Sequence, residues 1–127
     1  MNCKQRITEM NKMMAQGKVM EAFEKYYAED CEIIEKPTGE VRKGKDAQRK
    51  AIKDWFEMTQ EHHGGSIGAI TSDEDSKVTM VQSTTDVTMK GQGRMKMEEV
   101  AVQHWNDDGQ IVKEEFYYQL GPPPQMG

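Results

Sequence analysis

The sequence has few cysteines and no long apolar run. Its two cysteines, Cys3 and Cys31, are too few for the disulfide framework of a small secreted domain, so we expect free thiols. No apolar stretch reaches the roughly 18 residues of a membrane helix, and the first ten residues lack the apolar segment of a signal peptide. We therefore expect a cytoplasmic protein with no membrane partner.

Basic charge is also scarce. The 127 residues include 17 Lys and Arg against 22 Asp and Glu, a formal net charge of -5. Electrostatic binding of nucleic acid needs clustered cations, and only residues 41–50 are rich in them. Gly44 and Asp46 interrupt that stretch, so we expect no nucleic-acid partner.

Side chains at metal-ligand spacing are missing as well. His62 and His63 are adjacent, and neighbouring residues on a strand point to opposite faces. Residues 73–75 are acidic but lack the ligand spacing of a calcium loop. We predict neither a metal site nor a cofactor.

What remains is enough for one domain, because single domains commonly have about 100 to 150 residues. We assign residues 1–120 to it and residues 121–127 to a flexible tail rich in Pro and Gly. Only 35% of the residues are hydrophobic, which predicts a thin core. A thin core favours a dimer or a partly open interior.

The first half of the chain has helical periodicity. Apolar residues recur at spacings of three and four, which predicts helices over residues 8–16, 19–29 and 45–59, with Gly17 ending the first. Residues 31–36 are expected to form a short strand. Residues 40–43 then pair back on it or run along an edge.

The second half has the two-residue period of strands, over residues 62–72, 77–90, 94–105 and 110–120. These four are expected to form an antiparallel meander. Helices followed by strands predict an α+β fold with the helices on one face of the sheet.

Four glutamates lie in the last two predicted strands, which the turn "NDDG" joins. A hairpin over this turn pairs odd residues of the first strand with even residues of the second. One face then carries Met97, Glu99, Ala101, Gln103, Trp105, Val112, Glu114, Phe116 and Tyr118. The other carries Glu98, Val100, Val102, His104, Ile111, Lys113, Glu115 and Tyr117.

The first of these faces is richer in aromatic and small residues, so we assign it to the concave side under the helices. Glu99 and Glu114 then point inward, where two neighbouring carboxylates raise each other's pKa. Such a pair could be an acid and a base. Alternatively, each carboxylate is satisfied by a backbone donor, by Gln103 or by a lysine, or lies at a wet mouth of the interior.

Asp86, in the middle of the strand over residues 77–90, is a third candidate acid. It shares a face with the even residues of its strand. Whether that face is concave depends on a strand pairing that the sequence leaves open.

Three stretches, "YYAEDCEI", "GKDAQRKAIKDWF" and "VQHWNDDGQIVKEEFYYQ", give the chain a family likeness. From Ile7 to Gln119 it resembles the SnoaL-like branch of the nuclear transport factor 2-like superfamily. The resemblance implies a cone-shaped, strongly curved mixed or antiparallel sheet wrapped around three N-terminal helices. It also implies a pocket at one end of the cone and a homodimer through the sheet.

Ketosteroid isomerases, polyketide cyclases, epoxide hydrolases and dehydratases belong to this superfamily, and they share acid-base chemistry in a largely apolar pocket. The chain departs from the isomerase pattern, because Lys36 stands before Pro37 where the base aspartate is expected. In addition, Met10 or one of its neighbours stands in place of a tyrosine donor. This argues against ketosteroid isomerisation. In the cyclase pattern the matching stretch offers Glu114, with Phe116 at the position of the base.

We therefore predict a small-molecule-binding protein whose cone holds a compact, partly apolar molecule. The candidate catalytic acids are Glu114, as base or orienting acid, its partner Glu99, and Asp86. The candidate ligand-binding residues are Tyr27, Trp55, Gln103, Phe116 and Tyr118. The alternative function is a non-catalytic binding or association module whose cone is filled by methionines.

Overall fold

A computed structural model describes residues 1–119, which form three helices and one six-stranded sheet. The helices are α1 (Cys3–Ala15), α2 (Val19–Tyr26) and α3 (Lys45–Met58). The strands are β1 (Tyr27–Glu35), β2 (Glu40–Lys43), β3 (Thr59–Asp73), β4 (Val78–Met89), β5 (Gly93–Trp105) and β6 (Ile111–Tyr118). Their order in the sheet is β2, β1, β6, β5, β4, β3.

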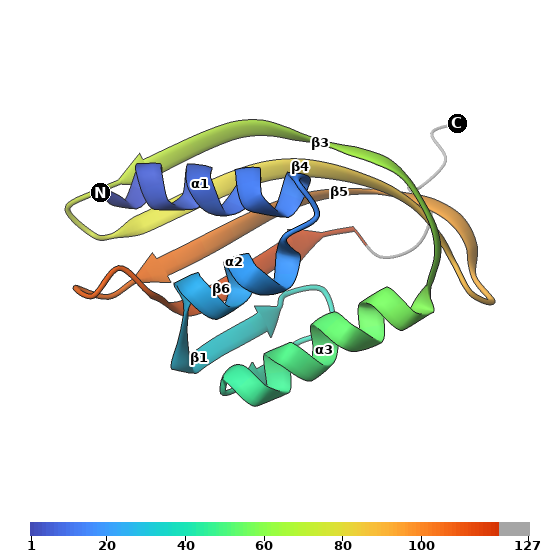
Figure 1. The fold of residues 1–127 in the computed structure, drawn as a ribbon, viewed down its shortest axis with the longest axis horizontal. Helices are drawn as coiled ribbons and strands as arrows, with labels where there is room; N and C mark the ends of the chain where they lie inside the picture. The colour runs from blue at the N-terminus through green and yellow to red at the C-terminus, as the bar shows by residue number, and fades with distance from the viewer. Residues whose placement is uncertain (120–127) are drawn as a thin grey trace.

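The sheet is mixed, because β1 runs parallel to β6 while all other neighbours are antiparallel. The long strands β3, β4 and β5 curve around the helices (Figure 1). The predicted α+β cone with a curved mixed sheet is therefore confirmed. The predicted meander corresponds to β3 through β6, and β2 pairs with β1 at one edge.

Helix α1 begins five residues earlier than predicted, at Cys3 instead of Thr8. Asn2 caps it by accepting a 2.8 Å hydrogen bond from the Gln5 amide, and the Gln5 side chain accepts one from the Asn2 amide. Glu74, in the turn after β3, also accepts from the free amides of the first turn. A cap and a distant carboxylate together satisfy donors that the apolar pattern does not register.

Helix α2 ends at Tyr26 and not at residue 29 as predicted, because the chain pairs with β6 from Tyr27 onward. Strand β1 is therefore longer than the predicted span of residues 31–36. Strand β3 likewise extends the predicted residues 62–72 to Thr59–Asp73 by pairing with β4 along its length. Ladder hydrogen bonds override local propensity at these ends.

The core lies between the helices and the inner face of the sheet. Its buried side chains come from α1, α2, β1, β4, β5 and the start of β6. They are Cys3, Ile7, Met10, Ala22, Phe23, Tyr26, Tyr27, Cys31, Ile33, Val81, Trp105 and Ile111. Both cysteines are buried free thiols.

The expectation that Ile111 faces outward is wrong. The register between β5 and β6 shifts between His104 and Trp105, so that Ile111 pairs with Trp105 and is fully buried. A bulge inserts one residue into a ladder, and one residue reverses the face. Parity counted from the turn therefore fails for Ile111 and holds from Lys113 onward.

The predicted tail of residues 121–127 lies outside the described residues. Within residues 1–119, no helix combines the length and the apolar character needed to cross a membrane.

Candidate functional site

The candidate site lies on the inner face of the sheet, where β5 and β6 meet. Gln103 pairs with Glu114, and Glu99 pairs with Tyr118. Gln103 also pairs with the fully buried Thr79 of β4. Because directly paired residues share a face, Glu99 and Glu114 both lie on the side of the sheet that faces the helices.

Glu114 is almost completely buried, with 2% of its surface exposed. The hydroxyl of Tyr27 donates a hydrogen bond to its Oε1 atom. The side-chain amide of Gln103 donates to its Oε2 atom over 2.7 Å. Both oxygens of the buried carboxyl group are thus held by donors from two neighbouring strands.

The hydrogen bonds continue beyond Gln103. The Thr79 hydroxyl donates to Gln103 Oε1 over 2.8 Å, and the Trp105 indole donates to Thr79 Oγ1 over 2.9 Å. Each of these residues is buried. A continuous polar chain therefore crosses an otherwise apolar interior from Trp105 to Glu114.

Burial raises the pKa of Glu114 to about 7, because the ionised form loses its hydration. The hydrogen bonds from Tyr27 and Gln103 lower this pKa, whereas the negative charge of Glu35 raises it. The net result is a carboxyl group that is close to half-protonated at neutral pH. Such a group can accept or release a proton without a large free-energy penalty.

Glu99 is half-buried, and its pKa is also raised to about 7. Burial is the main cause, and the charges of Glu114 and Glu35 add to it. Like charges disfavour simultaneous ionisation. The inner face therefore carries two carboxyl groups that titrate near neutrality.

Glu35 is a third inner acid, which the sequence reasoning did not include. It pairs with Phe116 in the parallel ladder, and its Oε1 atom lies 3.6 Å from Arg42 Nη2. Its Oε2 atom is buried and has no hydrogen-bond partner within residues 1–119. Burial raises the pKa of Glu35, although the Arg42 charge opposes the effect. Arg42 is itself held by a 2.8 Å bond from its Nε atom to Gln48 of α3.

A signal for Glu35 was present in the sequence. Cys31, Ile33 and Glu35 are every second residue of β1, and the first two are fully buried. The two-residue period therefore places Glu35 on the same face. Thr79 could have been found in the same way, because it lies two residues before the buried Val81 and so shares its face. Arg42 offered no comparable signal, since its strand has only four residues.

Two residues that are predicted to bind ligand, Tyr27 and Gln103, contact Glu114. Tyr27 and Gln103 are buried, and each donates a hydrogen bond to the Glu114 carboxyl group. Both residues thus support the acid, as the sequence allowed for Gln103, and their role as ligand contacts stays a prediction. The sequence pattern predicts Tyr27 within a helix, whereas it lies at the first position of β1.

Phe116 and Tyr118 lie on the inner face, opposite Ala101 and Glu99, and both are half-buried. The charges of Glu35 and Glu99, after burial, raise the pKa of Tyr118. Trp55 lies near the end of α3 and is 38% exposed. The ligand-binding role of all three stays a prediction.

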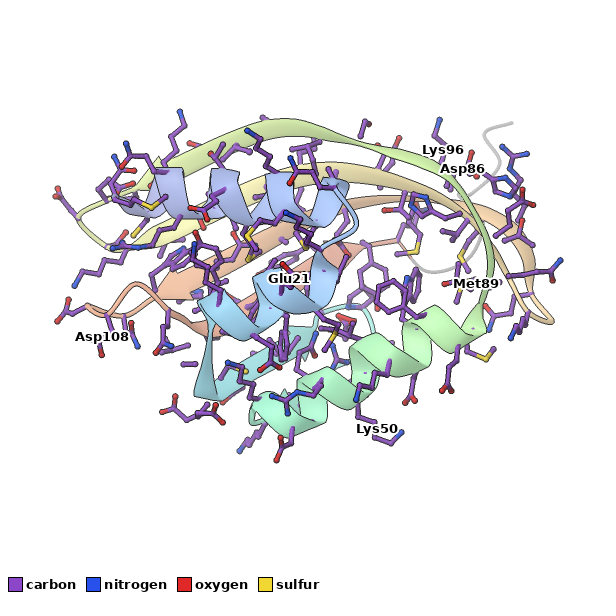
Figure 2. All side chains as sticks on the ribbon, viewed as in Figure 1. Glu21, Lys50, Asp86, Met89, Lys96 and Asp108 are labelled. Carbon is purple, nitrogen blue, oxygen red and sulfur yellow. The ribbon has the colours of Figure 1, made fainter. Side chains whose placement is uncertain are left out.

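Asp86 does not join the other two candidate acids. It pairs with Lys96, seven residues along β5 from Gln103, which is roughly 20 Å of strand. Figure 2 shows Asp86 and Lys96 at the end of the sheet opposite the turn with Asp108. Asp86 is adjacent to the buried Val87, and adjacent residues of a strand point to opposite faces, so Asp86 faces outward. Both its carboxylate oxygens accept hydrogen bonds from Arg94, which lowers the pKa of Asp86. We do not retain it in the site.

The outer face of the same strands has a different character. Glu115 accepts from His104 over 2.7 Å and lies 3.1 Å from the Lys36 ammonium group. These two contacts lower its pKa. Large apolar side chains are exposed nearby, namely Met80, Val100 and Tyr117.

Solved structures with the same fold include proteins described as enzymes. A candidate SnoaL-like polyketide cyclase from Mesorhizobium loti shares 30% identity, covers 93% of this chain and 100% of its own, and has a TM-score of 0.78. The epoxide hydrolase/cyclase-like enzyme SalBIII, described in pyran-ring formation in the polyether salinomycin, shares 23% identity, with a TM-score of 0.75 and coverage of 93% and 91%. A candidate isomerase from Bacillus subtilis shares 17% identity, with a TM-score of 0.77 and coverage of 94% and 90%.

The search of curated proteins found no match. The family model of the SnoaL-like domain, in contrast, matches residues 1–118. This match spans the helices, the sheet and the three acids of the inner face, Glu35, Glu99 and Glu114. The chain belongs to the SnoaL-like domain family.

Proposed function

We propose that the protein binds a small, partly apolar molecule on the inner face of its sheet and that Glu114 exchanges a proton with it. The observation that carries this proposal is the buried Glu114 carboxyl group, held by Tyr27 and Gln103 at a pKa of about 7. A general acid or base is most effective when its pKa is near the working pH. Isomerisation, cyclisation, hydration and dehydration all need such a transfer.

Glu99 is the partner acid in this proposal. Its pKa is raised in part by Glu114, so ionisation of one group favours protonation of the other. A site with one proton shared between two acids can remove a proton at one position and supply one at another. The half-buried Phe116 and Tyr118 would provide the apolar wall.

We further propose that two copies associate through the outer face of the sheet. The exposed Met80, Val100 and Tyr117 support this proposal, since exposed apolar side chains gathered on one face favour association. Sedimentation of the whole protein tests it. A charge introduced at Val100 should shift the equilibrium toward the monomer.

A non-catalytic binding or association module is the second candidate function. The observation that favours it is the burial of Glu114, whose two oxygens already have protein donors. In that case the polar chain only fixes the interior, and the raised pKa has no catalytic use.

The two functions separate in a proton-abstraction assay with 5-nitrobenzisoxazole. A carboxylate removes the ring C–H proton and the electron pair of that bond forms the C≡N triple bond of a nitrile. The N–O bond breaks with its electron pair on oxygen, which gives a coloured phenolate. We expect a rate above that of buffer, rising with pH around a midpoint near 7 because the ionised base increases. Glu114→Gln should lower the rate by about 100-fold or more, since it removes the base.

The matched control is Glu115→Gln, which alters the neighbouring acid on the outer face. It should leave both the rate and its pH midpoint unchanged. A Glu114→Gln protein as fast as the wild type would contradict the proposed role of Glu114. A wild-type rate no higher than that of buffer would favour the non-catalytic module.

A further inference from the structure

The polar chain behind Glu114 has a fixed direction, which begins at Trp105. An indole N–H can donate a hydrogen bond but cannot accept one. The Thr79 oxygen must therefore accept from Trp105 Nε1 at 2.9 Å. Trp105 is held in place because its ring packs edge-on against Tyr26, with the centroids 6.0 Å apart, and its backbone amide donates to Lys77.

Thr79 passes this direction to Gln103. Its hydroxyl has one proton, and with the Trp105 N–H on its oxygen that proton is free for the Gln103 Oε1 atom, 2.8 Å away. The oxygen end of the Gln103 amide is thereby fixed toward Thr79. The NH₂ end is left facing Glu114 Oε2, 2.7 Å away.

The opposite orientation of the amide is unfavourable at both ends. The Thr79 oxygen would face two donors, and its own proton would lose its partner. Gln103 Oε1 would face the Glu114 carboxylate, so that two acceptors would meet without a proton between them. Unmet polar groups are unfavourable in a buried interior, so the amide keeps its NH₂ end toward Glu114 when that group is ionised.

We propose that Thr79 and Trp105 are positioning residues, which act through Gln103 to keep an N–H donor on the Glu114 carboxylate. This inference rests on the proposed function, in which Glu114 must be able to ionise to accept a proton. Neither Thr79 nor Trp105 contacts the reacting atoms. Their effect is to hold a donor where the negative charge forms.

Other groups also affect the pKa of Glu114, and the test must separate their effects from that of the hydrogen-bonded series Trp105, Thr79 and Gln103. On β1 these are Tyr27, Cys31 and Glu35. Arg42 of β2 also acts on Glu114, and Glu99 of β5 is coupled to it by like charge. None of these groups shares a hydrogen bond with Thr79 among the described residues, so a change at Thr79 reaches Glu114 through Gln103.

The test is the titration of Glu114 followed by NMR of protein labelled with ¹³C at the glutamate carboxyl carbon. The Glu114 resonance is assigned as the one that Glu114→Gln removes. Thr79→Val keeps the shape of the side chain but removes the hydroxyl, which frees the Gln103 amide to turn. We expect the Glu114 midpoint to rise by about one pH unit, since a hydrogen bond to a charged group is lost.

Thr79→Ser is the matched control, because it keeps the hydroxyl and should keep the wild-type midpoint. Trp105→Phe removes the indole N–H and leaves the Thr79 hydroxyl, so it should raise the midpoint by a smaller amount. The indole ¹H–¹⁵N resonance of Trp105 should also move in Thr79→Val and stay in place in Thr79→Ser. If Thr79→Val and Trp105→Phe both fold and leave the Glu114 midpoint unchanged, the inference is overturned.

Failure of the positioning inference can be told apart from failure of the proposed function. The titration needs no ligand, so a shifted midpoint supports the positioning chain even if Glu114→Gln has no effect on the 5-nitrobenzisoxazole rate. Conversely, an unshifted midpoint together with an inactive Glu114→Gln would remove the positioning chain and leave the proposed base in place.

Discussion

Glu114 and Glu115 are adjacent in the sequence and have opposite electrostatic surroundings. Glu114 faces the helices, meets two neutral donors and has a pKa raised to about 7. Glu115 faces outward, meets His104 and Lys36 and has a lowered pKa. Two identical side chains one residue apart thus differ only in the face of the sheet that each occupies.

The difference shows that burial outweighs cationic pairing on the inner face, whereas cationic pairing prevails on the outer face. Glu35, Glu99 and Glu114 all have raised pKa values there, and Arg42 is the cation that acts on this group. On the outer face, acids such as Glu115 and Asp86 are paired with cations instead. A face on which burial keeps the pKa of its acids raised is suited to proton exchange.

The largest expected effect concerns the bulge that defines the two faces near the turn. Ile111→Ala should lower the free energy of unfolding by about 2 to 5 kcal/mol, because the fully buried side chain leaves a cavity. Val112→Ala, at the neighbouring half-buried position, should have a clearly smaller effect. Urea denaturation measures both. Equal effects would contradict the inward position of Ile111.

The next effect is the pH dependence of stability. The pKa of folded Glu114 lies near 7, above the ordinary value of 4.5, so at pH 5 to 7 the folded state binds a proton that the unfolded state has lost. Its contribution therefore favours folding at low pH, and it is lost as the pH rises from about 5 through 7. The loss is on the order of 3 kcal/mol, and half-buried Glu99 adds to it in the same direction.

Denaturation of the wild type at pH 5 and pH 8 measures this loss. Glu114→Gln should flatten the dependence, since the amide does not ionise. Glu115→Gln should leave the slope across pH 7 in place. A wild type that gained stability between pH 5 and pH 8 would argue against a raised pKa at Glu114.

A smaller effect is expected from the donor on the other oxygen of Glu114. Tyr27→Phe removes the hydroxyl that favours the ionised form, so the Glu114 midpoint should rise by about one pH unit. Tyr118→Phe is the control, since this tyrosine lies on the same face opposite Glu99. Carboxyl NMR titration distinguishes the two. If Glu114 had the same midpoint in both variants, the Tyr27 hydroxyl would not be what stabilises the ionised form of Glu114.

The smallest effect is expected on the outer face. His104→Ala removes the 2.7 Å contact with Glu115, which is partly exposed. Surface ion pairs contribute about 0 to 1 kcal/mol, so the free energy of unfolding should change by no more than that. The Glu114 titration should not change. A large loss of stability would show that the outer face also carries a buried network.

Much of the fold could be predicted because it depends on short-range patterns. Three- and four-residue spacing gave the helices, and two-residue alternation gave the long strands. The same alternation separated Glu99 and Glu114 from Glu98 and Glu115. It failed at Ile111, because the bulge depends on how β5 and β6 fit together.

The sequence by itself determined which side chains share a face along the regular parts of each strand, since alternation there depends on local backbone geometry. It did not determine the faces across a bulge, as at Ile111. Only the tertiary structure decided what each face meets. Tyr27 reaches Glu114 because β1 runs parallel to β6, and Thr79 reaches Gln103 because β4 pairs with β5 in one register. These contacts join residues far apart in the chain, and burial between strands then sets the pKa of Glu114.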